Sequence, residues 1–173
     1  LDVVTALSAI NSVDGRFQHI KEAGITAIVD YAHTPDALQN VLDTINAIRT
    51  SNEQLITVVG CGGDRDREKR PVMARIACEG STRVILTSDN PRTESPEAII
   101  SEMMEGVEAQ NYKKVLKITN REEAIKTAIS LSQPGDVILV AGKGHETYQE
   151  INGVRQPFDD KEVISKNIKL IKE

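Results

Sequence analysis

The segment Val84–Arg92 reads VILTSDNPR, a short apolar run that gives way to an acid, an amide, a proline and a guanidinium. The apolar part is typical of a buried strand. Pro91 fixes its own φ angle and biases Asn90 toward an extended conformation, so the polar groups are partly ordered in advance. An ordinary turn from a strand into a helix explains the segment as well, because Ser95-Pro96-Glu97 is a good helix start.

The same succession of apolar strand, polar loop and amphipathic helix recurs along the chain. Helices are expected after Thr34 as N-cap, around Val72–Ala77, over Pro96–Glu108, and from an Asn120 cap through Leu131. Asp159 or Asp160 is expected to cap a terminal helix, after a hairpin turn at 152–153. The expected strands are Phe17–Ile20, Ile25–Val29, Leu55–Val59, Val84–Leu86, Val115–Ile118 and Asp136–Ala141.

Strands that alternate with helices of about a dozen residues indicate right-handed crossovers and a mostly parallel sheet. The sequence therefore predicts a doubly wound α/β domain of about six strands with helices on both faces. In such folds ligands bind at the carboxyl ends of the strands. Four polar loops follow strands in this way: Asp30–His33, Gly60–Arg67, Asp89–Arg92 and Gly142–Glu146.

The four loops offer charges of both signs. Asp89, Asn90 and Arg92 together can hold an ammonium and a carboxylate, the two ends of an amino acid. Arg65 can pair with a carboxylate or phosphate, although a solvated helix start also explains its loop. Glu146 offers a counter-charge to an ammonium, and we expect Lys143, between two glycines, to be a flexible and exposed cation.

No loop contains a complete phosphate-binding motif. The glycine-rich loop has Arg65 where a dinucleotide fingerprint needs glycine, and neither this loop nor Gly142–Glu146 contains the Gly-Lys-Ser/Thr of a P-loop. Cys61 is more plausible as a small buried residue than as a nucleophile, because no base is identifiable beside it. His33 is open to two interpretations, a structural residue or a polar contact to a ligand.

Composition limits the classes of function. The 173 residues are 39% hydrophobic and 27% charged, with a net charge of -5, which gives no reason to expect nucleic acid or an anionic membrane as partner. No apolar run has the length of a membrane span, so we expect a cytoplasmic protein. Two cysteines and three histidines without metal-ligand spacing predict reduced thiols and no metal site.

Taken together, the loops resemble those of the C-terminal domain of the Mur ligases, the ATP-dependent amino-acid-adding enzymes of peptidoglycan synthesis. The resemblance runs from about Asp14 to the end of the chain. It rests on five segments in the family's order: Val29–Leu38, Gly60–Pro71, Asp89–Arg92, Ala141–Tyr148 and Phe158–Asp160.

The resemblance implies a domain at 14–173, preceded at 1–13 by the tail of a central ATPase domain and a linker, in keeping with a first residue that is not Met. The absent central domain would hold the P-loop and Mg²⁺, and an N-terminal domain would bind the UDP-sugar. Arg16 and Asp30, and less strongly His33, match positions that contact ATP. No residue of this chain is implied to be catalytic. The implied amino-acid-binding residues are Arg65, Asp89, Asn90, Pro91, Arg92, Gly142 and Glu146.

Within the family, the motifs most resemble those of members that add meso-diaminopimelate to UDP-N-acetylmuramoyl-L-alanyl-D-glutamate. In the implied reaction, ATP phosphorylates the glutamate side-chain carboxylate and the amine attacks the acyl phosphate, while this domain, expected to be part of a monomer, positions the amine. Two alternatives stay open. The chain could belong to a ligase that adds lysine or glutamate, or it could be a non-catalytic amino-acid-binding module.

Overall fold

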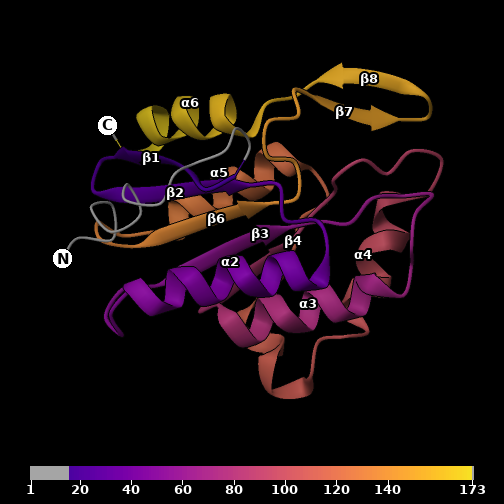
Figure 1. Cartoon of the computed structure of the whole chain (residues 1–173). Coiled ribbons are helices and arrows are strands. Elements are labelled where there is room, and N and C mark those ends of the chain that lie inside the picture. The colour runs from indigo at the N-terminus through magenta and orange to yellow at the C-terminus, as the bar shows by residue number, and fades with distance from the viewer. Residues whose placement is uncertain (1–15, 173) are drawn as a thin grey trace.

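The computed structural model describes residues 16–172, so the expected tail at 1–13 and the boundary at 14 lie outside the described residues. A six-stranded sheet forms the centre of the domain, in the order β1-β2-β6-β3-β4-β5 (Figure 1). The strands are β1 (Gln18–Glu22), β2 (Ile25–Asp30), β3 (Leu55–Val59), β4 (Arg83–Leu86), β5 (Val115–Lys117) and β6 (Val137–Ala141).

All neighbouring strands of this sheet are parallel except β1, which pairs antiparallel with β2 through a turn at 23–24. Strands β2, β3 and β6 are buried along their whole length, as expected for a sheet covered on both faces. Their registers bring Asp30 and Val59 opposite Ala141, so the polar loops that follow these strands start at one edge. The predicted doubly wound α/β fold is confirmed.

Helices cover both faces of the sheet (Figure 1). One face packs against the first three helices, and the other against the last two. Alternate residues of each strand divide between the two cores; Ile28 faces the first group and Val29 the second. The helices are α2 (Pro35–Ile48), α3 (Lys69–Gly80), α4 (Pro96–Met104), α5 (Arg121–Leu131) and α6 (Asp160–Lys172).

The expected N-caps are confirmed. The side chains of Thr34, Ser95 and Asn120 accept hydrogen bonds from backbone N–H groups in the first turns of their helices. At the last helix it is Asp159 that caps, through bonds from the N–H groups of Lys161 and Glu162.

The predicted end of one helix was wrong, and the predicted face of another was right in part. Helix α4 ends at Met104 and not at Glu108, because the chain turns where Gly106 passes against α3; a Cβ there would lie 1.8 Å from the Pro71 carbonyl oxygen. A 3₁₀ helix, η1 (Ala109–Lys114), follows. The expected face of α3, Val72, Met73, Ile76 and Ala77, is confirmed in part. Met73 and Ala77 are fully buried and Ile76 packs against the core half-buried, whereas Arg70, Ala74 and Cys78 take the place of Val72.

A separate hairpin, β7 (Tyr148–Ile151) with β8 (Val154–Pro157), stands beyond the carboxyl ends of the strands (Figure 1). Its turn has positive φ at Asn152 and Gly153, as the sequence predicts. Arg92 forms an isolated bridge with Ile151, so the hairpin is joined to the loop after β4. Within residues 16–172, none of the helices has the length and apolar character needed to cross a bilayer.

Candidate amino-acid-binding site

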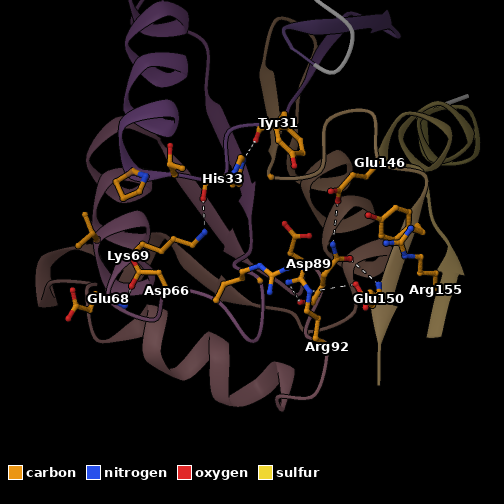
Figure 2. A pocket seen from close by; sticks show the side chains of 18 residues that line it. Tyr31, His33, Asp66, Glu68, Lys69, Asp89, Arg92, Glu146, Glu150 and Arg155 are labelled. Atoms are coloured by element: carbon orange, nitrogen blue, oxygen red, sulfur yellow. Dashed lines mark hydrogen bonds and ion pairs between the residues drawn. The ribbon is translucent and has the colours of Figure 1, made fainter. Parts of the chain in front are cut away.

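The loops after β2, β3, β4 and β6 surround one cleft of about 810 Å³, which the β7–β8 hairpin also lines (Figure 2). The cleft brings together six of the seven residues assigned to the amino acid. Pro91 is the exception, since it is buried with its carbonyl oxygen against Gly63. The six that line the cleft are Arg65, Asp89, Asn90, Arg92, Gly142 and Glu146.

The backbones of the glycine-rich loop and the loop after β4 are in direct contact. The Gly63 N–H donates to the Asn90 carbonyl oxygen at 2.8 Å, and a Cβ on Gly63 would lie 1.9 Å from the Pro91 oxygen. Gly142, in the loop after β6, has φ of 118°, and a Cβ on it would lie only 2.6 Å from Asp89 Oδ2. Glycine is therefore required where these loops meet.

Arg92 is held by backbone on two sides. It has φ of 53°, its N–H donates to the Glu150 carbonyl oxygen, and its own carbonyl oxygen accepts from Asn152. Its Nη1 donates to the Gly63 carbonyl oxygen at 2.9 Å, and its Nε lies 3.6 Å from Glu150 Oε2. Within residues 16–172, Nη2 makes no hydrogen bond, which leaves one edge of the guanidinium open to a ligand.

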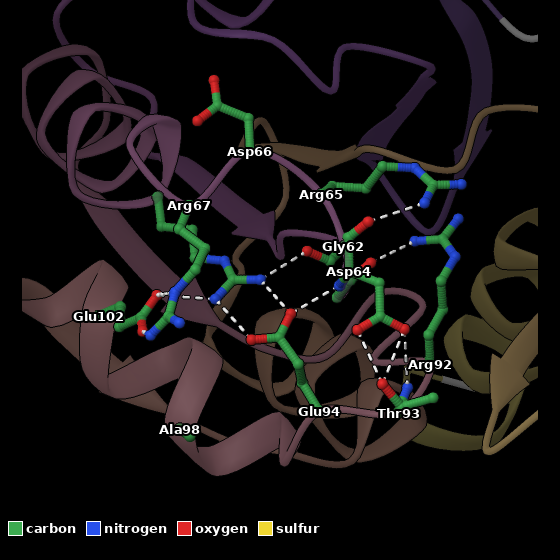
Figure 3. Close-up of polar contacts among 12 residues, drawn as sticks. Gly62, Asp64, Arg65, Asp66, Arg67, Arg92, Thr93, Glu94, Ala98 and Glu102 are labelled. Carbon is green, nitrogen blue, oxygen red and sulfur yellow. Dashed lines mark hydrogen bonds and ion pairs between the residues drawn. The ribbon is translucent and has the colours of Figure 1, made fainter.

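Arg65 is exposed and flanks the same part of the cleft. Its Nη1 donates to the Asp64 carbonyl oxygen, and a Cβ on Gly62 would lie within 4 Å of both the Arg65 and the Arg92 side chains. The two arginines lie side by side in Figure 3. Two arginine side chains beside one glycine make a favourable place for a carboxylate.

Lys143 is not the flexible, exposed cation that the sequence suggested. The side chain is fully buried beneath the cleft, and its Nζ donates to Asn90 Oδ1 at 2.7 Å and to the Tyr148 carbonyl oxygen at 2.9 Å. Carboxylate oxygens of Asp89 and Glu146 lie 3.2 and 3.6 Å from the same nitrogen. The prediction was wrong because the loop after β6 folds inward, where the loop after β4 supplies oxygens.

A second charged network fixes the glycine-rich loop from below (Figure 3). Arg70, fully buried on α3, donates to both oxygens of Glu94, to Glu102 and to the Gly62 carbonyl oxygen. Glu94 also accepts from the Asp64 N–H at 2.6 Å. The hydrogen bond from Arg70 is the main reason that the pKa of Glu94 falls to about 2.

The three residues assigned to ATP lie together at a second, smaller cleft of about 370 Å³. Asp30 is buried and both of its oxygens are occupied, by the N–H groups of Phe17 at 2.9 Å and Ala32 at 2.8 Å. Burial raises the pKa of Asp30, against the effect of those two bonds. Asp30 thus anchors the backbone on either side, while Arg16 and His33 are exposed and His33 lines both clefts.

Other cleft residues were not predicted individually as site residues. Tyr31, Glu150 and Arg155 line the cleft, and the Arg155 guanidinium lies 4.2 Å from the centre of the Tyr148 ring. The hairpin turn at 152–153 was predictable, but not that the hairpin reaches the cleft.

Cys61 is buried, and burial raises the pKa of its thiol to about 12. The prediction that Cys61 is a small buried residue, and not a nucleophile, is therefore the one that agrees with the structure. Within residues 16–172, no three His, Cys, Asp or Glu side chains group as a metal site.

Comparison with known proteins identifies the family of this chain. The sequence matches the family described as "Mur ligase, glutamate ligase domain" over residues 15–144. The chain belongs to the Mur ligase family. The motif resemblance and the fold expected from it are therefore confirmed.

Individual relatives of the Mur ligase family agree. The chain is 60% identical over 164 residues to the UDP-N-acetylmuramoyl-L-alanyl-D-glutamate–2,6-diaminopimelate ligase of Cytophaga hutchinsonii, and 53% identical over 156 residues to that of Clostridioides difficile. The alignments cover 94% and 88% of this chain but 34% and 31% of those proteins. The chain thus spans about a third of the length of the curated relatives that it matches.

Solved structures show the same relation. A structure of a UDP-N-acetylmuramoyl-L-alanyl-D-glutamate–2,6-diaminopimelate ligase matches with a TM-score of 0.85 and 49% identity, over 94% of this chain and 33% of that one. A folylpolyglutamate synthase from Thermotoga maritima matches with a TM-score of 0.57 and 23% identity, over 76% of this chain and 28% of that one. The second match supports the fold alone.

Proposed function

We propose that this chain is the amino-acid-binding domain of a longer ATP-dependent ligase that adds meso-diaminopimelate to UDP-N-acetylmuramoyl-L-alanyl-D-glutamate. One observation carries the proposal. The guanidinium groups of Arg65 and Arg92 and the carboxylates of Asp89 and Glu146, from loops far apart in the sequence, line a single cleft. The names of the relatives and the share of their length that this chain covers support the same conclusion.

The charges of the cleft suit the distal end of diaminopimelate, which carries an ammonium and a carboxylate. Arg92, assisted by Arg65, would bind the carboxylate through the open edge of its guanidinium. Asp89 and Glu146 would accept from the ammonium. Lysine lacks the distal carboxylate, so its binding would leave the open edge of the Arg92 guanidinium without an acceptor, a loss of about 1 to 3 kcal/mol.

The second cleft fits the side of ATP that faces this domain. The exposed Arg16 and His33 would contact the nucleotide, and Asp30 would hold their loops in place through its two backbone bonds. ATP supplies the phosphoryl group that activates the glutamate carboxylate. Mg²⁺ and the phosphate-binding loop belong, in this proposal, to the central domain of the longer enzyme.

The contribution of this domain to the reaction is positioning. The cleft fixes the distal end of the amino acid, so the other amine is presented to the activated carboxylate at a defined distance and angle. Closure of the domain over the reacting groups would also exclude water from the acyl phosphate.

Steady-state kinetics of the full-length ligase tests the proposal through Arg92→Ala. We expect the KM for meso-diaminopimelate to rise by about 30-fold or more, because the partly buried charge partner of the distal carboxylate is removed, while the KM for ATP stays unchanged. Arg83→Ala is the matched control, since Arg83 is the exposed first residue of β4, at the opposite end of that strand from the loop that carries Arg92. Unchanged kinetics in Arg92→Ala would overturn the substrate assignment.

Calorimetry on the isolated chain separates the domain from a free-standing module. A site that is completed by domain closure predicts weak or undetectable binding of diaminopimelate. Tight binding without any other domain would instead favour the non-catalytic amino-acid-binding module.

A further inference from the structure

We infer that Lys143 is a positioning and specificity-determining residue of the cleft, an internal ammonium that sets the charge of the site and the orientation of Asn90. The inference rests on the proposed function. Lys143 itself does not line the cleft; its Nζ contacts side-chain oxygens of Asp89, Asn90 and Glu146, which do line it.

The first step concerns the amide of Asn90. Its Oδ1 receives the Lys143 ammonium at 2.7 Å and the Glu150 N–H at 3.0 Å. Both groups can only donate, so the atom that they share must be the oxygen and the amide cannot be flipped. Asn90 Nδ2 consequently points the other way, toward Glu146 Oε1 at 3.4 Å. Lys143 thereby makes Asn90 a donor on the side of Glu146.

The second step concerns charge. Asp89 and Glu146 bring two negative charges to the floor of the cleft, and Lys143 lies within 3.6 Å of both. The three groups together carry a single negative charge, which matches one substrate ammonium. Without Lys143, Asp89 and Glu146 would lose a cation in direct contact with both, and the added negative charge at the cleft would weaken binding of the distal carboxylate of diaminopimelate.

The third step concerns rigidity. The Lys143 side chain is fully buried, and its bond to the Tyr148 carbonyl oxygen joins the loop after β6 to the start of the β7–β8 hairpin. Asn90 and Glu150 extend this connection to the loop after β4. One ammonium therefore positions three segments that supply residues to the cleft, and a fully bonded buried charge holds them in one arrangement.

Lys143→Met in the full-length ligase tests the inference, because methionine keeps most of the length and removes the charge. We expect the KM for meso-diaminopimelate to rise by about 30-fold or more while the KM for ATP is unchanged. We also expect the preference for diaminopimelate over L-lysine, as a ratio of kcat/KM values, to fall by about tenfold or more, because the extra negative charge favours the simple cation.

The split between KM and kcat separates this role from a structural one. A variant that only folds less well has fewer active molecules, so its kcat falls and its KM and selectivity do not move. Lys126→Met is the matched control, since Lys126 is a partly exposed lysine on α5, paired with Glu122 and Glu123, and wild-type kinetics are expected.

Asn90→Asp provides a second test if Lys143→Met does not fold. It keeps an oxygen toward Lys143 and the Glu150 N–H, and it replaces the Nδ2 donor by an acceptor facing Glu146. The KM for diaminopimelate should again rise by about 30-fold or more.

Failure of the inference and of the proposed function are distinguishable. A wild-type ligase that does not use diaminopimelate overturns both. A wild-type ligase that uses diaminopimelate, combined with unchanged KM and selectivity in Lys143→Met, overturns the inference alone. If Lys143→Met does not fold, an unchanged KM in Asn90→Asp has the same effect.

Discussion

Arg121 on α5 and Asp160 at the first residue of α6 form a fully buried bidentate pair, with Nε–Oδ1 and Nη2–Oδ2 distances of 2.8 Å. Arg121 also donates to the carbonyl oxygens of Ser88 and Ala141, at 3.2 and 3.3 Å. Burial alone would lower the pKa of Arg121, but the nearby Asp160 carboxylate raises it overall. The two carbonyls directly precede the loops that carry the cleft, so this pair sets the distance between them.

Asp160→Asn should therefore lower the free energy of unfolding by about 3 to 5 kcal/mol, because it leaves the Arg121 charge buried without a partner. Urea denaturation of the chain measures the change. Glu123→Gln is the matched control; its pair with Lys126 is largely exposed and contributes about 0.2 to 1 kcal/mol. Equal, small losses in both variants would contradict the role given to the buried pair.

Gly142→Ala should lower both stability and the affinity for diaminopimelate. The added Cβ is strained at φ of 118° and lies 2.6 Å from Asp89 Oδ2. Gly135→Ala controls for backbone strain, since Gly135 has φ of 98° and nothing within 4 Å of its Cβ position. Thermal unfolding and the KM of the full-length ligase compare the two. If Gly142→Ala has the same melting temperature and the same KM as Gly135→Ala, the contact with Asp89 is unimportant.

Acid should lower the stability of the folded chain, because Glu94 then takes up a proton. Its pKa is lowered from 4.5 to about 2 when folded, mainly by Arg70, so the unfolded chain takes up the proton first. The stability from this group is fully present above about pH 4.5 and is lost as the pH falls toward 2.

In Glu94→Gln, unfolding should be less dependent on pH between about 4.5 and 2, and the variant should be less stable than the wild type near neutral pH. Urea midpoints across that range measure this. Glu97→Gln serves as control because Glu97 contacts Ser95 and not Arg70. Parallel wild-type and Glu94→Gln curves would rule out the Arg70 network as a source of acid sensitivity.

Both cysteines should be unreactive toward thiol reagents in the native state. Burial raises the pKa of Cys61 to about 12 and also raises that of Cys78, so neither forms much thiolate near neutral pH. Thiol titration with a chromogenic disulfide should find both cysteines unreactive until the denaturant guanidinium chloride unfolds the chain. Rapid labelling of Cys61 in the native protein would contradict its burial.

The order of strands and helices was predictable because each element has a local signal. The β-branched runs Leu55–Val59 and Ile25–Val29 and the caps at Thr34 and Asn120 act within a few residues. The end of α4 was not predictable, because it depends on contact between Gly106 and a different helix.

The residues of the cleft were predictable as far as parallel strands bring their carboxyl ends to one edge. Contacts between loops were not predictable, as Lys143 illustrates. Lys143 is separated from its partner Asn90 by 53 positions, and no residue near Lys143 in the sequence indicates that its side chain is buried. Arg121 and Asp160 are likewise 39 positions apart, and each alone resembles an ordinary surface charge on a helix.

The central claim, that this cleft selects meso-diaminopimelate, is tested most directly by a competition reaction. The full-length ligase is supplied with ATP, UDP-N-acetylmuramoyl-L-alanyl-D-glutamate and equal concentrations of meso-diaminopimelate, L-lysine and D-glutamate, and the UDP-linked products are identified by mass spectrometry. The structure predicts that the diaminopimelate adduct forms almost alone in the wild type, and that the lysine adduct gains in proportion in Arg92→Ala. A wild-type reaction yielding mainly the lysine or glutamate adduct, or none, would contradict the claim.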